Sequence, residues 1–185
     1  MLDIDGGDID YFQAFNPLRR NLVLLNSPSI KSLNKLLPQL KKYQQEHPDC
    51  SISLLGYPSW QTYTSQLLQD FHQFDTFIYT PFYRNPSSKS VNDIENASER
   101  WFKSPMSNTY PRYALMGFDV AMFFLNGISR FGNDLEQHIN EVPFRPLHTP
   151  FRFVRANKDS GFVNHAVEFV HYTRQQEIEV LMRTE

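Results

Sequence analysis

The feature that most constrains the fold of this chain is a strand–helix unit that occurs twice. The stretches "LLNSPSI" at residues 24–30 and "LLGYPSW" at residues 54–60 both end an apolar run and then carry a Pro-Ser pair. Asn21–Leu25 and Ile52–Leu55 have the length and apolar character of short buried strands, and Thr76–Tyr79 is a third. Two copies at a spacing of 30 residues match a βαβ unit and are too few for a solenoid.

A helical pattern follows each of the first two strands. The apolar stripe of the first helix consists of Leu33, Leu36, Leu37, Leu40 and Tyr43. Pro38 lies inside this pattern, so we expect the helix to start late or to bend there. A second helix is expected at Thr62–Phe71. Because strand–helix–strand connections are right-handed crossovers between parallel strands, the sequence predicts an α/β fold with a parallel sheet.

After the third strand the chain changes character. The loop "PFYRNPSSKS" at residues 81–90 is rich in proline and serine and suits a hinge. The next segment predicts a helix with one apolar side formed by Val91, Ile94, Trp101 and Phe102.

A second helix is expected at Tyr113–Ile128, and a short third helix at Asn133–Asn140. Tyr113–Ile128 is apolar almost all round, so it should be buried on several sides, but Asp119 interrupts it and it is short for a bilayer span. The strands visible in this chain are too few to cover it. We therefore expect an exposed apolar face, self-association or rearranged packing.

The C-terminal part is expected to contain strands. Pro150–Arg155 and Phe162-Val163 flank a turn. Ala166–Tyr172 and Glu177–Met182 predict a β-hairpin around Thr173–Gln176, because apolar and charged residues alternate in its second arm.

Composition and charge exclude several classes of protein. The chain has 185 residues, 41% hydrophobic and 21% charged, which is typical of a globular domain and not of a disordered chain. A net charge of −2 without a basic run argues against nucleic-acid binding. Cys50 is the only cysteine, so no internal disulfide can form, and a buried inert thiol is expected. The acidic N-terminus shows no signal peptide, and the chain as given is expected to be soluble.

No catalytic, metal or cofactor motif is present in the sequence. The acidic stretch "DIDGGDID" at residues 3–10 does not fit a calcium loop, since the required glycine and glutamate positions hold other residues. The six histidines lack the spacing of a zinc motif, and His171 in a predicted strand is expected to be packed or exposed. Nucleophile-elbow, phosphate-loop and dinucleotide motifs are absent. We therefore expect a protein that is not an enzyme and has no cofactor or metal.

The two Pro-Ser turns are the candidate ligand site. In an open parallel sheet, ligands bind beyond the carboxyl ends of the strands, where helices begin. Ser29 and Ser59 lie at such ends, and a helix start offers N–H groups and partial positive charge to an anion. Tyr57 and Trp60 add flat faces and hydrogen-bond donors. The alternative is that each Pro-Ser pair only starts a helix.

With this organisation the chain resembles the C-terminal half of a type I periplasmic binding protein, the branched-chain amino acid receptor family. "RNLVLLNSPSIKSLNKLLPQLKKY" resembles the second-lobe strand, ligand turn and helix, and "SISLLGYPSW" the next strand and turn. "FDTFIYTPFY" is similar to the strand that enters the hinge. "TYPRYALMGFDVAMFFLNGI" resembles the helix that returns to the first lobe, and "PFRFVRANKDSGFVNHAVEFVHY" the closing turn and strand. The stretch "YPRYALMGFD" is similar to a segment of exported Bacteroidetes proteins that join a lysin-motif peptidoglycan-binding module to such a receptor-like region.

The resemblance implies a three-layer α/β/α sheet with a C-terminal β-hairpin. It divides the chain into a second-lobe βαβαβ region at 1–83, a hinge with first-lobe-like helices and hairpin at 84–163, and strands returning to the second lobe at 164–185. Two departures stand out. The first-lobe strands have no counterpart here, and no acid follows the strand Ile52–Leu55, where the receptors often hold a ligand amine.

The resulting expectation is a non-catalytic, solute receptor-like module of the periplasm or cell envelope. It would bind a small polar or anionic solute, such as an amino acid, in an inter-lobe cleft. The contacting residues would be Ser27, Ser29, Tyr57, Ser59 and Trp60. The alternative is a structural or protein-interaction module that kept this fold and lost its ligand. For either function we expect contacts with transporter or peptidoglycan-linked partners, and self-association.

Overall fold

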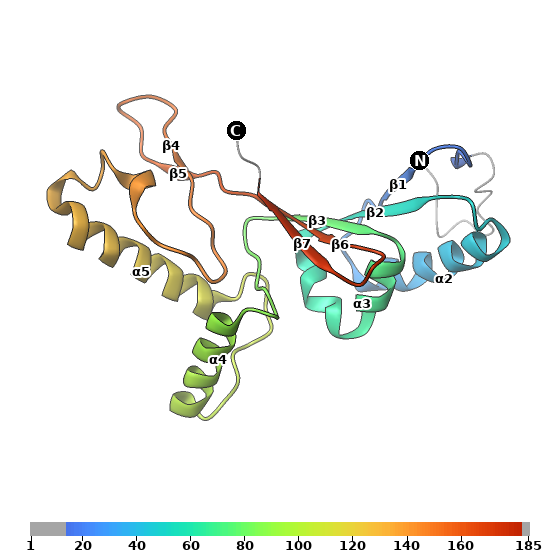
Figure 1. Cartoon of the computed structure of the whole chain (residues 1–185), viewed down its shortest axis with the longest axis horizontal. Coiled ribbons are helices and arrows are strands. Elements are labelled where there is room, and N and C mark those ends of the chain that lie inside the picture. Colours follow the sequence, from blue (N-terminus) through green and yellow to red (C-terminus); the bar gives the residue numbers. More distant parts are fainter. Residues whose placement is uncertain (1–13, 183–185) are drawn as a thin grey trace. The chain divides into compact units, whose positions relative to one another are not determined.

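The structure is a computed structural model that describes residues 14–182. The acidic stretch at residues 3–10, which does not fit a calcium loop, lies outside this range. The chain divides into two compact units (Figure 1). Unit 1 holds residues 14–79 and 170–180, and unit 2 holds residues 80–169 with the end of the last strand.

A mostly parallel sheet organises unit 1. Its five strands lie in the order β1 (Asn21–Leu24), β2 (Ile52–Gly56), β3 (Thr76–Thr80), β6 (Glu168–Tyr172) and β7 (Ile178–Met182). The first three strands pair in parallel, with Leu22 opposite Ser53 and Leu55 opposite Phe77. The predicted α/β class and the three parallel strands are confirmed.

Two helices follow the first two strands and lie on one side of the sheet (Figure 1). α2 (Ile30–Glu46) begins directly after Ser29, so the expected late start is wrong, and the helix continues through Pro38. The second helix begins earlier than expected, as the 3-10 helix η1 (Pro58–Tyr63), which passes into α3 (Thr64–Gln73). Proline at the first helical position explains this early start, because its missing N–H is not needed there.

The core of unit 1 is aromatic. Trp60 is fully buried and stacks on Phe71, with ring centroids 5.8 Å apart and planes 7° from parallel. Phe71 in turn contacts Tyr172 of β6 at 5.5 Å. Gly56 provides the space for the indole, since a Cβ at this position would lie 2.2 Å from Cε3 of Trp60. Only glycine fits at the end of β2 while Trp60 keeps its position.

The opposite side of the sheet carries exposed apolar side chains. Leu22 and Leu24 of β1 are each 60% exposed, and Tyr79 of β3 is 40% exposed. Leu22 and Leu24 alternate along their strand with half-buried residues, as the pleat of a strand requires. Unit 1 therefore has one apolar sheet face beneath helices, and its other face exposes Leu22, Leu24 and Tyr79.

Unit 2 contains two α-helices, two short 3-10 helices and a two-stranded antiparallel sheet. These are α4 (Lys89–Phe102), α5 (Tyr113–Phe131), η2 (Gly132–Asp134), η3 (Ile139–Glu141), β4 (Phe153–Val154) and β5 (Val163–Asn164). The predicted α-helix at Asn133–Asn140 is wrong. Gly132, with φ +55°, ends α5, and the residues after it are too few to stabilise more than isolated 3-10 turns.

Helix α5 is buried along one side only. The buried residues Leu115, Asp119, Phe123 and Gly127 recur every four positions. Phe123 packs among Phe151, Phe153 and Phe144, at centroid distances of 4.4, 5.4 and 6.4 Å. The other side exposes Tyr113, Val120, Phe124, Leu125 and Ile128. Burial on several sides is therefore wrong, whereas the expected exposed apolar face is present.

Two further features of unit 2 concern apolar surface. Trp101 and Phe102, expected on the apolar side of the helix before α5, are 83% and 77% exposed at the end of α4. Within residues 14–182, one helical segment, Tyr113–Asp134, is long and apolar enough to cross a bilayer, and 22% of its most apolar window is buried. Core helices of soluble proteins pass the same test.

Gly56→Ala tests the packing of the indole. The added methyl would overlap Trp60, so we expect a loss of about 1–3 kcal/mol in the free energy of unfolding, as in other overpacked cores. Gly117→Ala is the matched control, because a Cβ at Gly117 of α5 meets no atom within 4 Å. That variant should gain about 0.5–1 kcal/mol from helix propensity. Urea unfolding measures both, and equal effects of the two substitutions would contradict the packing role of Gly56.

Candidate functional site

The two Pro-Ser turns lie side by side at the carboxyl ends of β1 and β2. The hydroxyl of Tyr57 donates a hydrogen bond of 2.7 Å to the carbonyl oxygen of Leu25. The indole N–H of Trp60 donates to the carbonyl oxygen of Pro28 at 3.2 Å. Both bonds run from the second turn to the first. The structure thus brings together the two turns that the sequence places 30 residues apart.

Several groups expected to contact a ligand are engaged within the chain. The Oγ of Ser29 caps α2 by accepting from the N–H of Lys31 at 3.2 Å. The carbonyl oxygen of Ser29 accepts from the N–H groups of Ser32 and Leu33 at 3.1 and 3.2 Å. The Oγ of Ser27 accepts from the N–H of Ser29 at 3.3 Å. Few N–H groups at this helix start are therefore left for an anion.

Ser59 differs from the other four predicted residues. Its side chain is half-buried and has no hydrogen-bond partner among the described residues. Its carbonyl oxygen accepts from Oγ1 of Thr62 at 2.8 Å, which fixes the backbone of η1. Trp60 is fully buried, so its indole holds the turn instead of facing solvent. Ser59 is the side chain at this edge that is best placed to bind another molecule.

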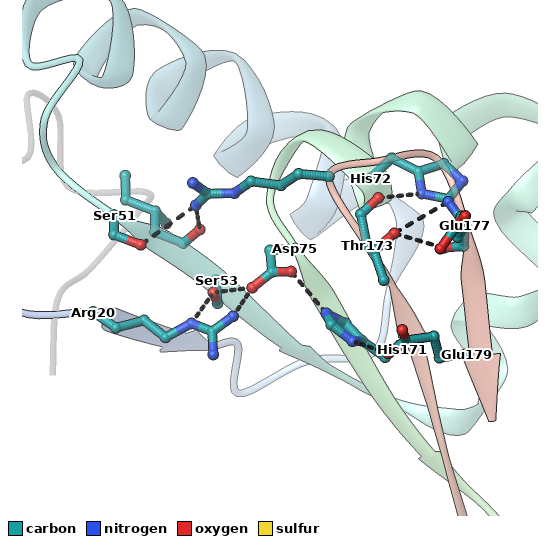
Figure 2. Close-up of polar contacts among 11 residues, drawn as sticks. Arg20, Ser51, Ser53, His72, Asp75, His171, Thr173, Glu177 and Glu179 are labelled. Atoms are coloured by element: carbon teal, nitrogen blue, oxygen red, sulfur yellow. Dashed lines mark hydrogen bonds and ion pairs between the residues drawn. The ribbon is translucent and has the colours of Figure 1, made fainter. Parts of the chain in front are cut away.

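A polar network that the sequence did not indicate lies at the opposite edge of the sheet (Figure 2). Asp75, directly before β3, accepts from Oγ of Ser53 at 3.0 Å and contacts Nε2 of His171 at 2.7 Å. It also forms an ion pair with Arg20, which precedes β1. The other ring nitrogen of His171 lies 3.1 Å from Oε2 of Glu179. Phe77 stacks on the imidazole at a centroid distance of 3.9 Å.

This network contains a serine, a histidine and an aspartate but is not arranged for nucleophilic catalysis. A serine nucleophile must hydrogen-bond to the histidine that takes its proton. Here Ser53 donates to Asp75, and both nitrogens of His171 face carboxylates. The network instead connects β2, β3, β6 and β7. No sequence motif pointed to it, because Arg20, Asp75 and His171 are far apart along the chain.

Asp119 is the polar centre of unit 2. Its carboxylate accepts from three consecutive backbone N–H groups, those of Leu147, His148 and Thr149, at 2.9, 2.8 and 2.7 Å. Burial raises the pKa of Asp119, and these three hydrogen bonds oppose that shift. The aspartate that interrupts the apolar helix thus ties α5 to the segment before β4.

His148 is held as a neutral side chain in the same unit. Its ring stacks on Phe82 at 5.5 Å, and its Nδ1 lies 3.1 Å from Oγ1 of Thr149. Nε2 accepts the backbone N–H of Arg112 at 3.4 Å. Burial lowers the pKa of His148 to about 4, and the charge of Arg112 adds to this shift.

Glu95 of α4 bridges two arginines. Arg84 donates to both of its oxygens at 2.9 and 2.5 Å, and Arg112 donates to one of them at 3.2 Å. Burial alone would raise the pKa of Glu95, but the hydrogen bond and charge of Arg84 and the charge of Arg112 hold it below its usual range. Asn92 and Asn108 take further guanidinium donors. This cluster is satisfied internally.

Tyr83 and Glu168 are two titratable side chains whose pKa values are both raised. Both are buried in unit 2, and burial raises the pKa of Glu168 to about 7. Burial, together with the nearby charge of Glu168, raises the pKa of Tyr83 to about 12, against the opposing charge of Arg84.

Two further features bear on ligands and metals. A depression of about 740 Å³ on α4 is lined by Asp93, Asn96, Glu99, Arg100 and Lys103, and no predicted ligand residue lines it. In the part of the chain that the structure describes, no group of three or more His, Cys, Asp or Glu side chains is placed to hold a metal ion.

Asp119→Ala is expected to destabilise unit 2. It leaves three backbone N–H groups without their acceptor, so we expect a loss of about 3–5 kcal/mol in the free energy of unfolding. The matched control is Asp93→Ala on α4, whose carboxylate is 59% exposed and forms only an i,i+4 pair with Lys89. That change should cost less than about 0.5 kcal/mol. Chemical unfolding of both variants checks this, and a loss below about 1 kcal/mol at Asp119 would contradict its anchoring role.

The pH dependence of stability provides a test of Glu168. Its folded pKa of about 7 lies above the ordinary value of 4.5, so the folded state keeps a proton that the unfolded state releases. Stability should therefore be highest below pH 4.5 with respect to this group and fall as pH rises to 7. Glu168→Gln removes the effect, so we expect it to stabilise the protein by about 1–3 kcal/mol at pH 8 and by little near pH 4.5. Urea unfolding at both pH values measures the difference, and a stabilisation independent of pH would rule out this titration.

Comparison of the chain with models of protein families, with curated proteins and with solved structures finds no match.

Proposed function

We propose that this chain is a non-catalytic, solute-binding module with the fold of a type I periplasmic receptor. In this proposal the sheet of unit 1 belongs to a three-layer α/β/α lobe, and β6 and β7 are the arms of the C-terminal β-hairpin. The ligand is a small polar or anionic solute, such as an amino acid. The protein works in the periplasm or cell envelope, with transporter or peptidoglycan-linked partners.

The observation that carries this proposal is the juxtaposition of the two Pro-Ser turns beyond the carboxyl ends of parallel strands. Open α/β sheets bind ligands at this edge. The bonds from Tyr57 to Leu25 and from Trp60 to Pro28 fix the two turns to each other before any ligand arrives. A fixed edge loses little conformational entropy on binding. Ser59 then supplies a hydroxyl whose hydrogen bonds are not used within the described chain.

In this proposal the five predicted residues have different roles. Ser59 contacts the solute through its side chain. Tyr57 and Trp60 hold the turn in place, because their polar groups are bound to the first turn. Ser27 and Ser29 shape the first turn and present its backbone.

A structural or protein-interaction module is the second candidate. It is favoured by the internal use of the polar groups of Ser29, Tyr57 and Trp60, as expected for turns that only start helices. It is also favoured by the open sheet face of unit 1, where Leu22 and Leu24 are each 60% exposed. Contiguous exposed apolar surface marks interaction sites.

Native mass spectrometry of the purified protein separates the two candidates. A receptor should carry or release a small molecule, and a panel of amino acids and small carboxylates should contain one that raises the unfolding temperature. If no solute is released and none shifts the unfolding temperature, the interaction module becomes the better-supported function.

Ser59→Ala tests the role of the free hydroxyl. For a solute identified in that way, we expect affinity to fall by a factor of about 5–150, which corresponds to the cost of about 1–3 kcal/mol for leaving the solute's buried polar group without its partner. Stability should change by less than about 0.5 kcal/mol, because the hydroxyl has no hydrogen-bond partner among residues 14–182. Ser65→Ala, on the exposed side of α3, is the matched control and should leave affinity unchanged. Calorimetric titration measures both, and an unchanged affinity for Ser59→Ala would remove this residue from the site.

A further inference from the structure

The imidazole of His171 on β6 is held between two carboxylates (Figure 2). Its Nε2 lies 2.7 Å from Oδ1 of Asp75, and its Nδ1 lies 3.1 Å from Oε2 of Glu179 on β7. The side chains of His171 and Asp75 are 15% and 11% exposed. Phe77 stacks on the ring at 3.9 Å with planes 9° from parallel, which fixes the ring in an orientation that faces both carboxylates.

These two contacts require two ring protons. A neutral imidazole has one N–H group and one lone pair, whereas an imidazolium has two N–H groups. An ionised carboxylate only accepts hydrogen bonds, so a neutral ring donates to one carboxylate and turns its lone pair toward the other. The geometry at His171 is therefore complete only when the ring is positively charged.

The charges around His171 favour the same protonation state. Asp75 and Glu179 face the ring, and Arg20 forms an ion pair with Asp75. An imidazolium makes this cluster neutral, whereas a neutral ring leaves it with one excess negative charge. Glu168 belongs to the same strand, but it lies three residues earlier and so points to the other face of the sheet.

The two carboxylates differ as partners of the ring. Asp75 is buried, and it also accepts from Oγ of Ser53 and pairs with Arg20. Glu179 is 51% exposed and belongs to β7, the last strand in the order of the sheet. When the ring loses a proton, the shorter contact to the buried carboxylate keeps its hydrogen bond, because an unpaired buried group costs more than an exposed one.

We propose that His171 is a pH-dependent switch that binds the edge strand β7 through Glu179 when its ring is doubly protonated and releases Glu179 when its ring is neutral. The switch lies next to the points at which the chain passes between the two units. β6 enters unit 1 at Val170, directly before His171, and β7 leaves it after Val180, directly after Glu179. Protonation therefore acts on two of the segments that connect the units.

Nitrogen NMR of the full chain, with ¹⁵N-labelled histidine, tests the protonation of the ring, and His171→Gln assigns the signals. We expect both ring nitrogens to carry protons at about pH 5, and Nε2 alone to carry one at about pH 8, since histidine changes its charge in this range. The proton is lost from Nδ1 because Nε2 faces the buried Asp75. A neutral ring with its proton on Nδ1 would contradict the switch.

Glu179→Gln tests the connection to β7 in a variant whose changed side chain is half exposed. At about pH 5 it should raise the unfolding equilibrium constant about two- to fivefold, as for the loss of an exposed ion pair. At about pH 8 it should leave this constant unchanged or lower it, because the amide can donate to the neutral Nδ1. The contribution of the pair is thus present at low pH and is lost as the pH rises.

Urea unfolding at the two pH values measures this difference, and any titration of Glu168 is common to both proteins and cancels. Glu177→Gln, an exposed residue in the turn before β7, is the matched control and should have the same effect at both pH values. If the effect of Glu179→Gln is also the same at both, the switch is wrong. The result does not depend on the solute site, because these variants leave Ser59 unchanged.

Discussion

The architecture of unit 1 depends on the burial of one indole. Trp60 lies over Gly56, stacks on Phe71 and donates its N–H to the carbonyl oxygen of Pro28. A single side chain therefore joins the end of β2, the core helix α3 and the turn before α2. Because the indole is fully buried, its polar N–H needs a partner, and the backbone of the neighbouring turn supplies it. The spacing of the two strand–helix units is thus fixed by packing and by hydrogen bonding at the same point.

Three carboxylates within residues 14–182 are each held by several donors. Asp119 has three backbone donors, Asp75 has Arg20, Ser53 and His171, and Glu95 has two arginines. In each case the cost of removing a carboxylate from water is offset by several donors, and the result is a connection between distant segments. Glu168 differs from these carboxylates, because burial raises its pKa to about 7.

The sequence predicted the parts of the fold that depend on local pattern. The three parallel strands were recognisable because each is a short apolar run followed by a helical stripe, and the two turns met because adjacent parallel strands end at the same edge. The segment after α5 was misjudged because Gly132 ends the helix and the residues that follow form only 3-10 turns. The Asp75 network was missed because it joins residues from 20 to 179, and no spacing rule links them. In the predicted ligand site, the sequence correctly placed Tyr57 and Trp60 at the turns but could not show that their donors are bound to Leu25 and Pro28.

The use of those donors limits what the turns can do as a solute site. A helix start binds an anion through several free N–H groups, but Ser29 already satisfies those of Lys31, Ser32 and Leu33. The hydroxyl of Ser59 can add one hydrogen bond, which contributes about 0.5–1.5 kcal/mol net. A solute bound here must therefore gain most of its affinity from contacts beyond the two turns. An interaction module faces no such requirement, because the exposed leucines of β1 offer apolar area directly. The two functions consequently differ in their physical basis: the first needs further polar contacts to a solute, and the second needs only a partner that covers the open face of the sheet.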